Sequence, residues 1–247
     1  MGQTIAILSG KGGTGKTSFT AAVSTALALQ KHRVLCLDCD VGLRNLDISL
    51  GLTDQALMDF SDVIHHRCTL EEAVVHHPQL PRLHFLTAPM YLPAQEIPLE
   101  GMRQLLSQVR ESYDYCLIDA PAGIGSGFRL ALADADRAVV VCTAESASLR
   151  DAQRVVAELK DLPRGCVHLA VNRIQRKLLR QIHQTIDDVM DTAGLPLIGV
   201  IPEDPRVPLA ANQNIPLLLT DDSYAAQAYR NIARRLTGEH VSIMKIK

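Results

Sequence analysis

A glycine-rich stretch near the amino terminus restricts the possible folds of this chain more than any other feature. Residues 10–17 read Gly-Lys-Gly-Gly-Thr-Gly-Lys-Thr, which fits the phosphate-loop pattern of a glycine, four residues and Gly-Lys-Thr. An apolar run precedes this stretch at residues 4–8, and residues 18–30 carry apolar side chains at helical spacing. Strand, loop and helix in this order favour a nucleotide-binding loop over a glycine-rich linker.

The residue types of this loop suit an anionic nucleotide. Glycines let the backbone turn tightly and point successive N–H groups inward. Lys16 can reach the β- and γ-phosphates, the Thr17 hydroxyl can bind Mg²⁺, and the following helix presents its positive end. The predicted phosphate-binding residues are Gly10, Lys11, Gly12, Gly13, Thr14, Gly15, Lys16, Thr17 and Ser18.

Lys11 is a second lysine in this loop, where Lys16 alone suffices to hold a nucleotide. It is either a solvated surface charge or a charge donated to the phosphate of another molecule. Phosphoryl transfer gains most from an extra cation near the γ-phosphate, and that cation can come from a second subunit. We therefore favour the role in trans.

The stretch from Ser9 to Thr17 resembles the deviant Walker A loop of the MinD/ParA family of ATPases. In that family the first lysine reaches across a dimer that encloses two ATP molecules. The resemblance implies an ATP-dependent homodimer in which Lys11 and Lys16 both take part in catalysis. It also implies ATP or ADP and Mg²⁺ as the ligands.

Two further apolar strands end in carboxylates. Residues 34–37 lead into Asp38-Cys39-Asp40, and residues 115–118 lead into Asp119, which is the Walker B pattern. Open parallel sheets bind ligands at the carboxyl ends of their strands. We expect Asp40 to orient a water or a magnesium-bound water, and Asp119 to bind magnesium through water. An ordinary loop with three acidic residues is the alternative for residues 38–47.

Three segments add to the resemblance. Residues 40–47 closely resemble switch I of the MinD branch of the family, and residues 119–123 resemble its switch II. The resemblance implies that Asp40 helps to activate the attacking water and that Asn45 senses the nucleotide state. Residues 148–151 resemble a segment near the dimer face that contributes to partner docking, although a charged first helical turn explains them nearly as well.

The predicted base contacts lie in the second half of the chain. Asn172 and Arg173 end an apolar strand; an Asn amide can pair with a purine edge, and an Arg can stack on a ring. In related ATPases an Asn at this strand end recognises adenine, and residues 202–205 resemble the loop that lies over it. The expected contacts are Asn172, Arg173, Pro202, Glu203 and Asp204.

Six or seven short apolar strands alternate with helices along the whole chain, without a linker or an internal repeat. This pattern predicts one α/β domain over residues 1–247, a P-loop NTPase with a mainly parallel twisted sheet and helices on both faces. The expected helices include residues 59–66, 69–77, 99–113, 145–159, 176–190 and 224–236.

Composition excludes several function classes. A net charge of −2 and the absence of Trp argue against a nucleic-acid-binding surface. No apolar run approaches the roughly 18 residues of a membrane span, and no secretory segment is recognisable, so we expect a cytoplasmic protein. Cys36 and Cys39 are expected to be buried free thiols, and the His pairs at 65–66 and 76–77 to be solvated helix ends.

The carboxyl-terminal tail, about residues 238–247, departs from the family pattern. MinD-branch proteins usually finish with a short amphipathic helix that binds the membrane only in the dimer. Here residues 241–247 are apolar and basic, but the apolar side chains do not collect on one helical face, and so short a segment binds weakly. The tail is a minimal anchor, a truncated one, or evidence that the protein does not use membranes in this way.

The resemblance implies an ATPase switch that sits on the inner face of the cell membrane in its ATP state and positions the division septum. Its expected partners are a MinC-like division inhibitor and a MinE-like ATPase activator. The alternatives are a ParA-like partition ATPase that binds DNA, and a scaffold that positions another cargo such as a flagellum. The net charge and residues 40–47 count against the first alternative, whereas the weak tail leaves the second open.

Overall fold

Eight strands form a single sheet in the computed structural model, which describes residues 2–163, 165–220 and 222–244. The strands are β1 (Gln3–Leu8), β2 (Val34–Asp38), β3 (Val75–His76), β4 (Leu83–Leu86), β5 (Tyr115–Asp119), β6 (Arg137–Cys142), β7 (Val167–Ile174) and β8 (Leu197–Pro202). Their order is β3-β4-β2-β5-β1-β6-β7-β8, and every pairing is parallel except that of β3 with β4. The predicted α/β fold with a mainly parallel sheet is confirmed.

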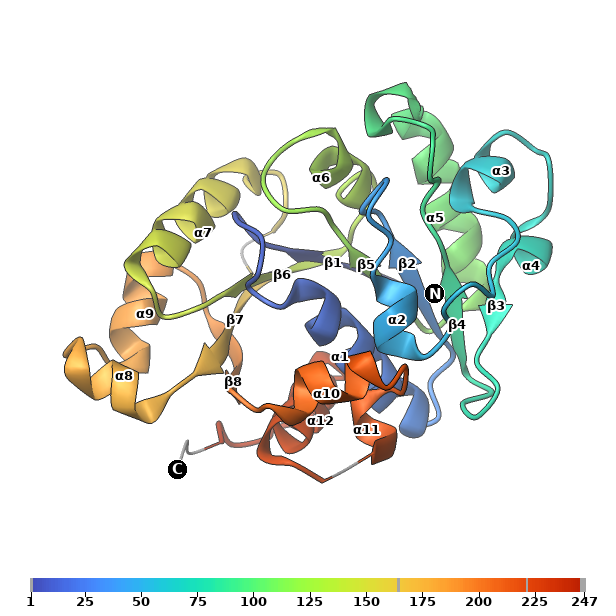
Figure 1. Ribbon diagram of the computed structural model, residues 1–247. Coiled ribbons are helices and arrows are strands. Elements are labelled where there is room, and N and C mark those ends of the chain that lie inside the picture. The colour runs from blue at the N-terminus through green and yellow to red at the C-terminus, as the bar shows by residue number, and fades with distance from the viewer. Residues whose placement is uncertain (1, 164, 221, 245–247) are drawn as a thin grey trace.

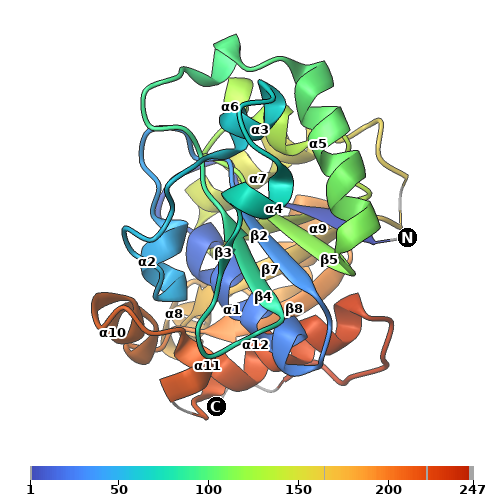
Figure 2. The same ribbon diagram turned by 90° about the vertical axis from the view of Figure 1, so that its right-hand side faces the viewer.

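Helices connect the strands and cover both faces of the sheet (Figure 1). They are α1 (Lys16–Leu29), α2 (Leu46–Leu50), α3 (Phe60–Ile64), α4 (Leu70–Ala73), the 3-10 helix η1 (Ala94–Glu96), α5 (Leu99–Ser112), α6 (Ser126–Ala131), α7 (Ser146–Glu158), α8 (Arg176–Gln181), α9 (Ile186–Ala193), α10 (Arg206–Asn212), α11 (Leu217–Thr220) and α12 (Tyr224–Leu236). Helices α1 and α12 pack on one face, and α5, α7 and α9 pack on the other. Figure 2 shows α5 and α12 on opposite sides of the strands.

The central strand β1 shows why both faces need helices. Successive side chains of a strand point to opposite faces. Ile5 and Ile7 lie in the core under α1 and α12, whereas Ala6 and Leu8 lie in the core under α5 and α7. All four side chains are completely buried, as expected for a parallel sheet that is covered on both sides.

The parallel arrangement brings the candidate site residues to one edge of the sheet. Parallel strands all end at the same edge, because each connection crosses back through a helix. The loops after β1, β2 and β5 therefore meet there, and these loops carry the glycine-rich stretch and the two predicted carboxylates. Strands β7 and β8 end at the same edge with Asn172, Arg173 and Pro202.

The expected helix over residues 69–77 is wrong in its second half. Helix α4 ends at Ala73, and Val75 and His76 form β3, which pairs antiparallel with β4. The β-branched Val74 and Val75 favour an extended backbone once a neighbouring strand is available. His77 is buried rather than solvated: its Nε2 lies 3.0 Å from the Leu50 carbonyl oxygen.

The expected basic helix over residues 176–190 is two helices. Helix α8 ends at Gln181, and His183 takes the left-handed conformation with a φ of 50°. Thr185 then caps α9, since its side chain accepts a hydrogen bond from the Asp188 backbone N–H. The Thr185 cap starts a new helix at a position where the apolar periodicity alone predicted one continuous helix.

The terminal helix and the cysteines agree with expectation. Helix α12 spans residues 224–236 as predicted, and Cys36 and Cys39 are buried free thiols. Residues 238–244 of the predicted tail contain no helix, and Arg235 Nε donates to the Val241 carbonyl oxygen at 2.8 Å. Residues 245–247 of the tail lie outside the described residues. Among the described helices, none combines the length and the apolar character needed to span a membrane.

Candidate nucleotide-binding site

The glycine-rich loop joins β1 to α1 and has the shape of an anion cradle. Gly13 and Gly15 have φ values of 77° and 89°, which other residues rarely adopt. A Cβ atom added to Gly12 or Gly13 would meet nothing within 4 Å, so this side of the loop is open. Helix α1 starts at Lys16, and its positive end therefore faces the loop. These features fit a bound phosphate chain.

Lys16 is buried beneath the loop. Its Nζ donates to Ser9 Oγ at 2.8 Å, and Ser9 Oγ donates to the Lys11 carbonyl oxygen at 2.7 Å. Burial lowers the pKa of Lys16, while the carboxylates of Asp119 and Asp40 act in the opposite direction. A buried ammonium among carboxylates and helix-end N–H groups suits the β- and γ-phosphates.

Lys11, the second lysine of the loop, is partly exposed and contacts a different element. Its Nζ is 2.9 Å from Glu145 Oε2, at the start of α7. The side chains are 33% and 59% exposed, and such exposed ion pairs stabilise a fold by only about 0–1 kcal/mol. Lys11 is thus paired with the start of α7 by a contact that adds little to the stability of the fold.

The predicted magnesium ligands lie together at the end of β5. Thr17 Oγ1 donates to Asp119 Oδ2 at 2.6 Å, and Thr20 Oγ1 donates to Asp119 Oδ1 at 3.2 Å. Burial raises the pKa of Asp119 to about 6. No three His, Cys, Asp or Glu side chains gather as a metal site among the described residues. This donor set fits Mg²⁺, which usually takes one or two protein oxygens and completes its shell with water and phosphate.

Asp38 is a site residue that sequence reasoning missed. It pairs in register with Asp119 across β2 and β5, and it is almost completely buried. Burial and the nearby Asp119 carboxylate raise the pKa of Asp38, while the backbone N–H groups of Asp40 and Leu46 donate to its carboxylate. Asp38 thus anchors both ends of residues 40–46. Its position at the end of an apolar strand was the available signal.

Asp40 and Asn45 occupy different environments. Asp40 is partly buried; burial raises its pKa, and Lys16 counteracts this shift. Asp40 therefore lies near the predicted phosphate site. Asn45 is exposed at the residue before α2. The structure thus brings Asp40 close to Lys16.

A cavity of about 610 Å³ adjoins the loop on the β7–β8 side. Its lining contains all five predicted base contacts, namely Asn172, Arg173, Pro202, Glu203 and Asp204. Arg173 Nη2 donates to Glu203 Oε1 at 2.9 Å, and Gln175 donates to the same carboxylate. These hydrogen bonds, first that from Gln175 and then that from Arg173, lower the pKa of Glu203.

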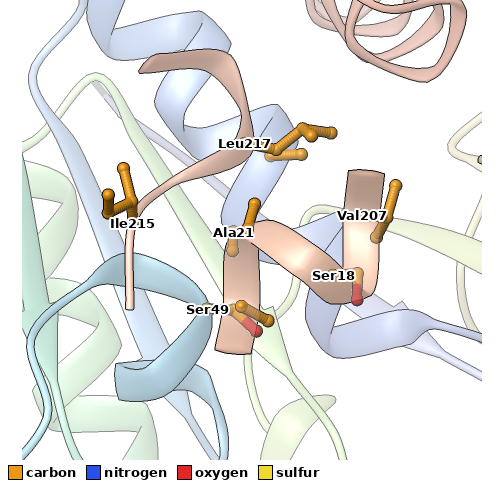
Figure 3. A pocket seen from close by; sticks show the side chains of 9 residues that line it. Ser18, Ala21, Ser49, Val207, Ile215 and Leu217 are labelled. Carbon is orange, nitrogen blue, oxygen red and sulfur yellow. The ribbon is translucent and has the colours of Figure 1, made fainter. Parts of the chain in front are cut away.

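The cavity wall also contains residues that the sequence did not indicate. Tyr229 from α12 is buried and packs edge-on against Phe19, with ring centroids 6.1 Å apart. Val207 of α10 lines this cavity and also a second one of about 20 Å³ between α1, α2 and α10 (Figure 3). The second cavity has room for one water molecule and none for a nucleotide.

Comparisons with known proteins agree with this geometry. A family model described as an AAA domain matches residues 2–168. The septum site-determining protein MinD of Synechocystis sp. is 38% identical over 247 residues, which cover 99% of this chain and 92% of that protein. The Bacillus subtilis protein of the same name is 36% identical, covering 100% and 93% respectively.

Solved structures show the same fold over nearly the full length. The Aquifex aeolicus structure titled MinC:MinD cell division protein complex matches with a TM-score of 0.90 and 36% identity, covering 98% of each chain. The Pyrococcus horikoshii MinD structure, described as complexed with Mg-ADP, matches with a TM-score of 0.84 and 29% identity, covering 96% of each chain.

Proposed function

The chain belongs to the MinD family of P-loop ATPases, and on this basis we propose that it is an ATP-dependent dimerising switch that positions the division septum. The observation that carries the proposal is the meeting of Lys16, Asp40 and Asp119 beside the glycine-rich loop, in a chain that matches these relatives over nearly its full length. In this role the protein recruits a division inhibitor to the membrane.

The proposed site uses each residue for one task. Lys16 and the loop N–H groups hold the β- and γ-phosphates, and Thr17 and Asp119 hold Mg²⁺ directly or through water. Asp40 orients the attacking water, for which a partly buried carboxylate of raised pKa is suited. The bound Mg²⁺ supplies charge neutralisation on the phosphates. Arg173 and residues 202–204 enclose the base.

Lys11 is proposed to complete the partner's site in a dimer that closes over two nucleotides. The exposed pair with Glu145 supports this proposal, because an ion pair of this kind costs little to break. A cation delivered in trans stabilises the charge that develops during phosphoryl transfer. Closure therefore depends on the γ-phosphate, and hydrolysis releases the dimer.

The partners follow from the relatives. The Aquifex aeolicus structure holds MinC together with MinD, and this supports a MinC-like inhibitor as a partner of this chain. A MinE-like activator belongs to the same proposal. A single weak tail does not keep one chain on the membrane, whereas the two tails of a dimer bind the membrane together and keep it attached. Because the dimer forms with ATP, membrane attachment depends on ATP.

Co-sedimentation with vesicles that contain anionic lipid tests the proposal. We expect pelleting with Mg²⁺ and a non-hydrolysable ATP analogue, and none with ADP. Lys16→Ala is the matched control; it should pellet in neither state, because the phosphate site loses its buried cation. Pelleting of Lys16→Ala with the analogue would contradict the assignment of the loop.

A second outcome distinguishes the alternative. The alternative is a scaffold that positions another protein cargo without binding the membrane. If the wild-type protein dimerises with the analogue but never pellets, the ATPase assignment stands and the membrane role is wrong.

A further inference from the structure

Helix α8 carries three cations that no acidic side chain balances. Arg176, Lys177 and Arg180 are exposed, and none of them forms an ion pair with a residue that the structure describes. Together with Gln175 and Gln181 they line a surface cavity of about 660 Å³. Several exposed arginines elsewhere do pair with a carboxylate, namely Arg67 with Asp62, Arg103 with Glu100 and Arg154 with Asp151. Helix α8 thus gathers unpaired positive charge in a chain whose net charge is −2.

The fold gains little from these three side chains. Helix α8 has no buried residue, and it contacts the core through the partly buried Leu179. Arg176 and Arg180 are four residues apart, so they are neighbours on the helix surface, and like charges at this spacing destabilise a helix. The helix contains no acidic residue that could offset this repulsion. The cations therefore cost stability, which points to a role in binding another molecule.

Helix α8 and the carboxyl-terminal tail lie at opposite edges of the sheet. Helix α8 follows the carboxyl end of β7, and its Leu178 and Leu179 line a cavity of about 100 Å³ together with Glu145 at the start of α7. Figure 1 shows α8 at the outer end of the molecule, next to α9. The tail leaves α12 at the amino end of β6, where Arg137 Nη1 donates to the Leu236 carbonyl oxygen at 2.9 Å. A membrane that holds the tail is therefore a poor candidate for the partner of α8.

The surroundings of α8 favour a short anionic partner over a long one. A helix of this length measures about 9 Å, which about three residues of an extended peptide would span. Exposed carboxylates follow in α9, at Asp187, Asp188 and Asp191. They would repel a long polyanion such as duplex DNA, whereas a short acidic peptide segment need not approach them. Carboxylates also accept two parallel hydrogen bonds from an arginine guanidinium.

We infer that α8 binds a short acidic segment of a partner protein through Arg176, Lys177 and Arg180. This inference goes beyond the proposed ATPase switch, and the contacts that support it do not involve the nucleotide site. Because α8 shares a cavity with Glu145, which pairs with Lys11, a partner held on α8 would lie close to the nucleotide loop.

A hexaglutamate peptide tests the inference. Binding of the fluorescently labelled peptide to the full chain is followed by anisotropy at low salt, without nucleotide. The α8 variant combines Arg176→Gln, Lys177→Gln and Arg180→Gln. We expect this variant to bind about tenfold more weakly than the wild-type protein, because three exposed charge contacts are lost. The wild-type affinity should fall as the salt concentration rises.

A matched control variant removes the same amount of charge elsewhere. It combines Arg67→Gln, Arg103→Gln and Arg230→Gln, three arginines that each pair with a carboxylate. This control should bind the peptide as the wild-type protein does. Both variants should bind ADP normally, and in urea unfolding the α8 variant should be no less stable than the wild-type protein, since it loses a repulsion. These measurements separate loss of the binding surface from loss of structure.

Two other anionic probes, a short DNA duplex and vesicles that contain anionic lipid, are measured beside the peptide. If the α8 variant loses binding to the duplex or the vesicles but keeps the peptide, the partner is a nucleic acid or a membrane and the inference is wrong. Equal losses of peptide binding in both variants would assign the binding to overall charge and overturn it, as would a wild-type protein that does not bind the peptide. Failure of the wild-type protein to bind ADP would instead refute the proposed nucleotide site.

Discussion

Two buried carboxylates dominate the site at the scale of single residues. Asp38 and Asp119 end adjacent strands in register, and burial raises the pKa of each. Burying a carboxylate is unfavourable, and Lys16 offsets only part of the effect of burial at Asp119, so this end of the sheet costs the protein stability. A bound cation beside Asp119 would offset that cost. A binding site of this kind is less stable when empty than a region whose side chains serve stability alone.

This cost predicts how stability depends on pH. The pKa of Asp119 is about 6 in the folded protein and 3.8 ordinarily, so the folded state binds more protons between these values. The contribution of Asp119 to the free energy of unfolding should therefore fall as the pH rises from about 4 to about 6. Urea unfolding without Mg²⁺, followed by circular dichroism, measures this change.

Asp119→Asn is the matched control. It keeps the shape and removes the titration, so the difference in stability between the variant and the wild-type protein should grow in favour of the variant as the pH rises through this window. The same variant should lose stabilisation by Mg²⁺ with ADP at pH 7. A pH-independent difference between the two proteins would contradict the assigned burial of the charge.

At the scale of elements, α12 is the helix that connects the end of the chain to the nucleotide site. It packs on α1 and β8, and its Tyr229 reaches the wall of the base cavity. The close approach to β8 depends on Gly199, where an added Cβ atom would lie 2.4 Å from Ile232 Cγ1. The position of α12 is thus sensitive to one side chain in a strand.

We predict that Gly199→Ala lowers the free energy of unfolding by about 1–3 kcal/mol, as overpacking in a core does. Ile232→Ala removes the atoms that clash, so the double variant should be less destabilised than the sum of the two single variants. Urea unfolding followed by circular dichroism measures all three. At Gly165 an added Cβ atom meets nothing within 4 Å, and Gly165→Ala should change stability by no more than about 0.5 kcal/mol. Simple additivity at residues 199 and 232 would refute the steric account.

At the scale of the whole molecule, Lys11 is the residue through which nucleotide binding is coupled to dimerisation in the proposed switch. In the single chain it pairs with Glu145, and in the proposed dimer it reaches the partner's phosphate. Lys11→Ala should therefore bind ADP as the wild-type protein does and remain monomeric with a non-hydrolysable ATP analogue. Light scattering coupled to gel filtration measures the molecular mass in each state.

Glu145→Gln provides the complementary variant. It removes the charge that holds Lys11 in the single chain, so it should dimerise with the analogue at least as readily as the wild-type protein. Dimerisation of Lys11→Ala with the analogue would show that Lys11 does not act in trans.

Local sequence determined the parts of this protein that depend on neighbouring residues. Spacing and hydrophobicity identify the phosphate loop at residues 10–17 and the apolar strands that end at Asp38 and Asp119. Together these features predict a parallel sheet that binds its ligand at the carboxyl ends of its strands. The misjudged segments, residues 69–77 and 176–190, are those where a β-strand partner or a helix cap overrides the local periodicity.

Only the tertiary structure decided which side chains meet at that edge. The register of β2 and β5 places Asp38 beside Asp119, and the bond from Asn172 to Thr14 joins residues 158 positions apart. Tyr229 reaches the base cavity from the last helix. Which strands become neighbours, and which helix packs on them, depends on contacts between distant segments, so the local pattern alone does not determine which side chains meet. For this reason the sequence indicated the phosphate site, whereas the structure showed what holds it in place.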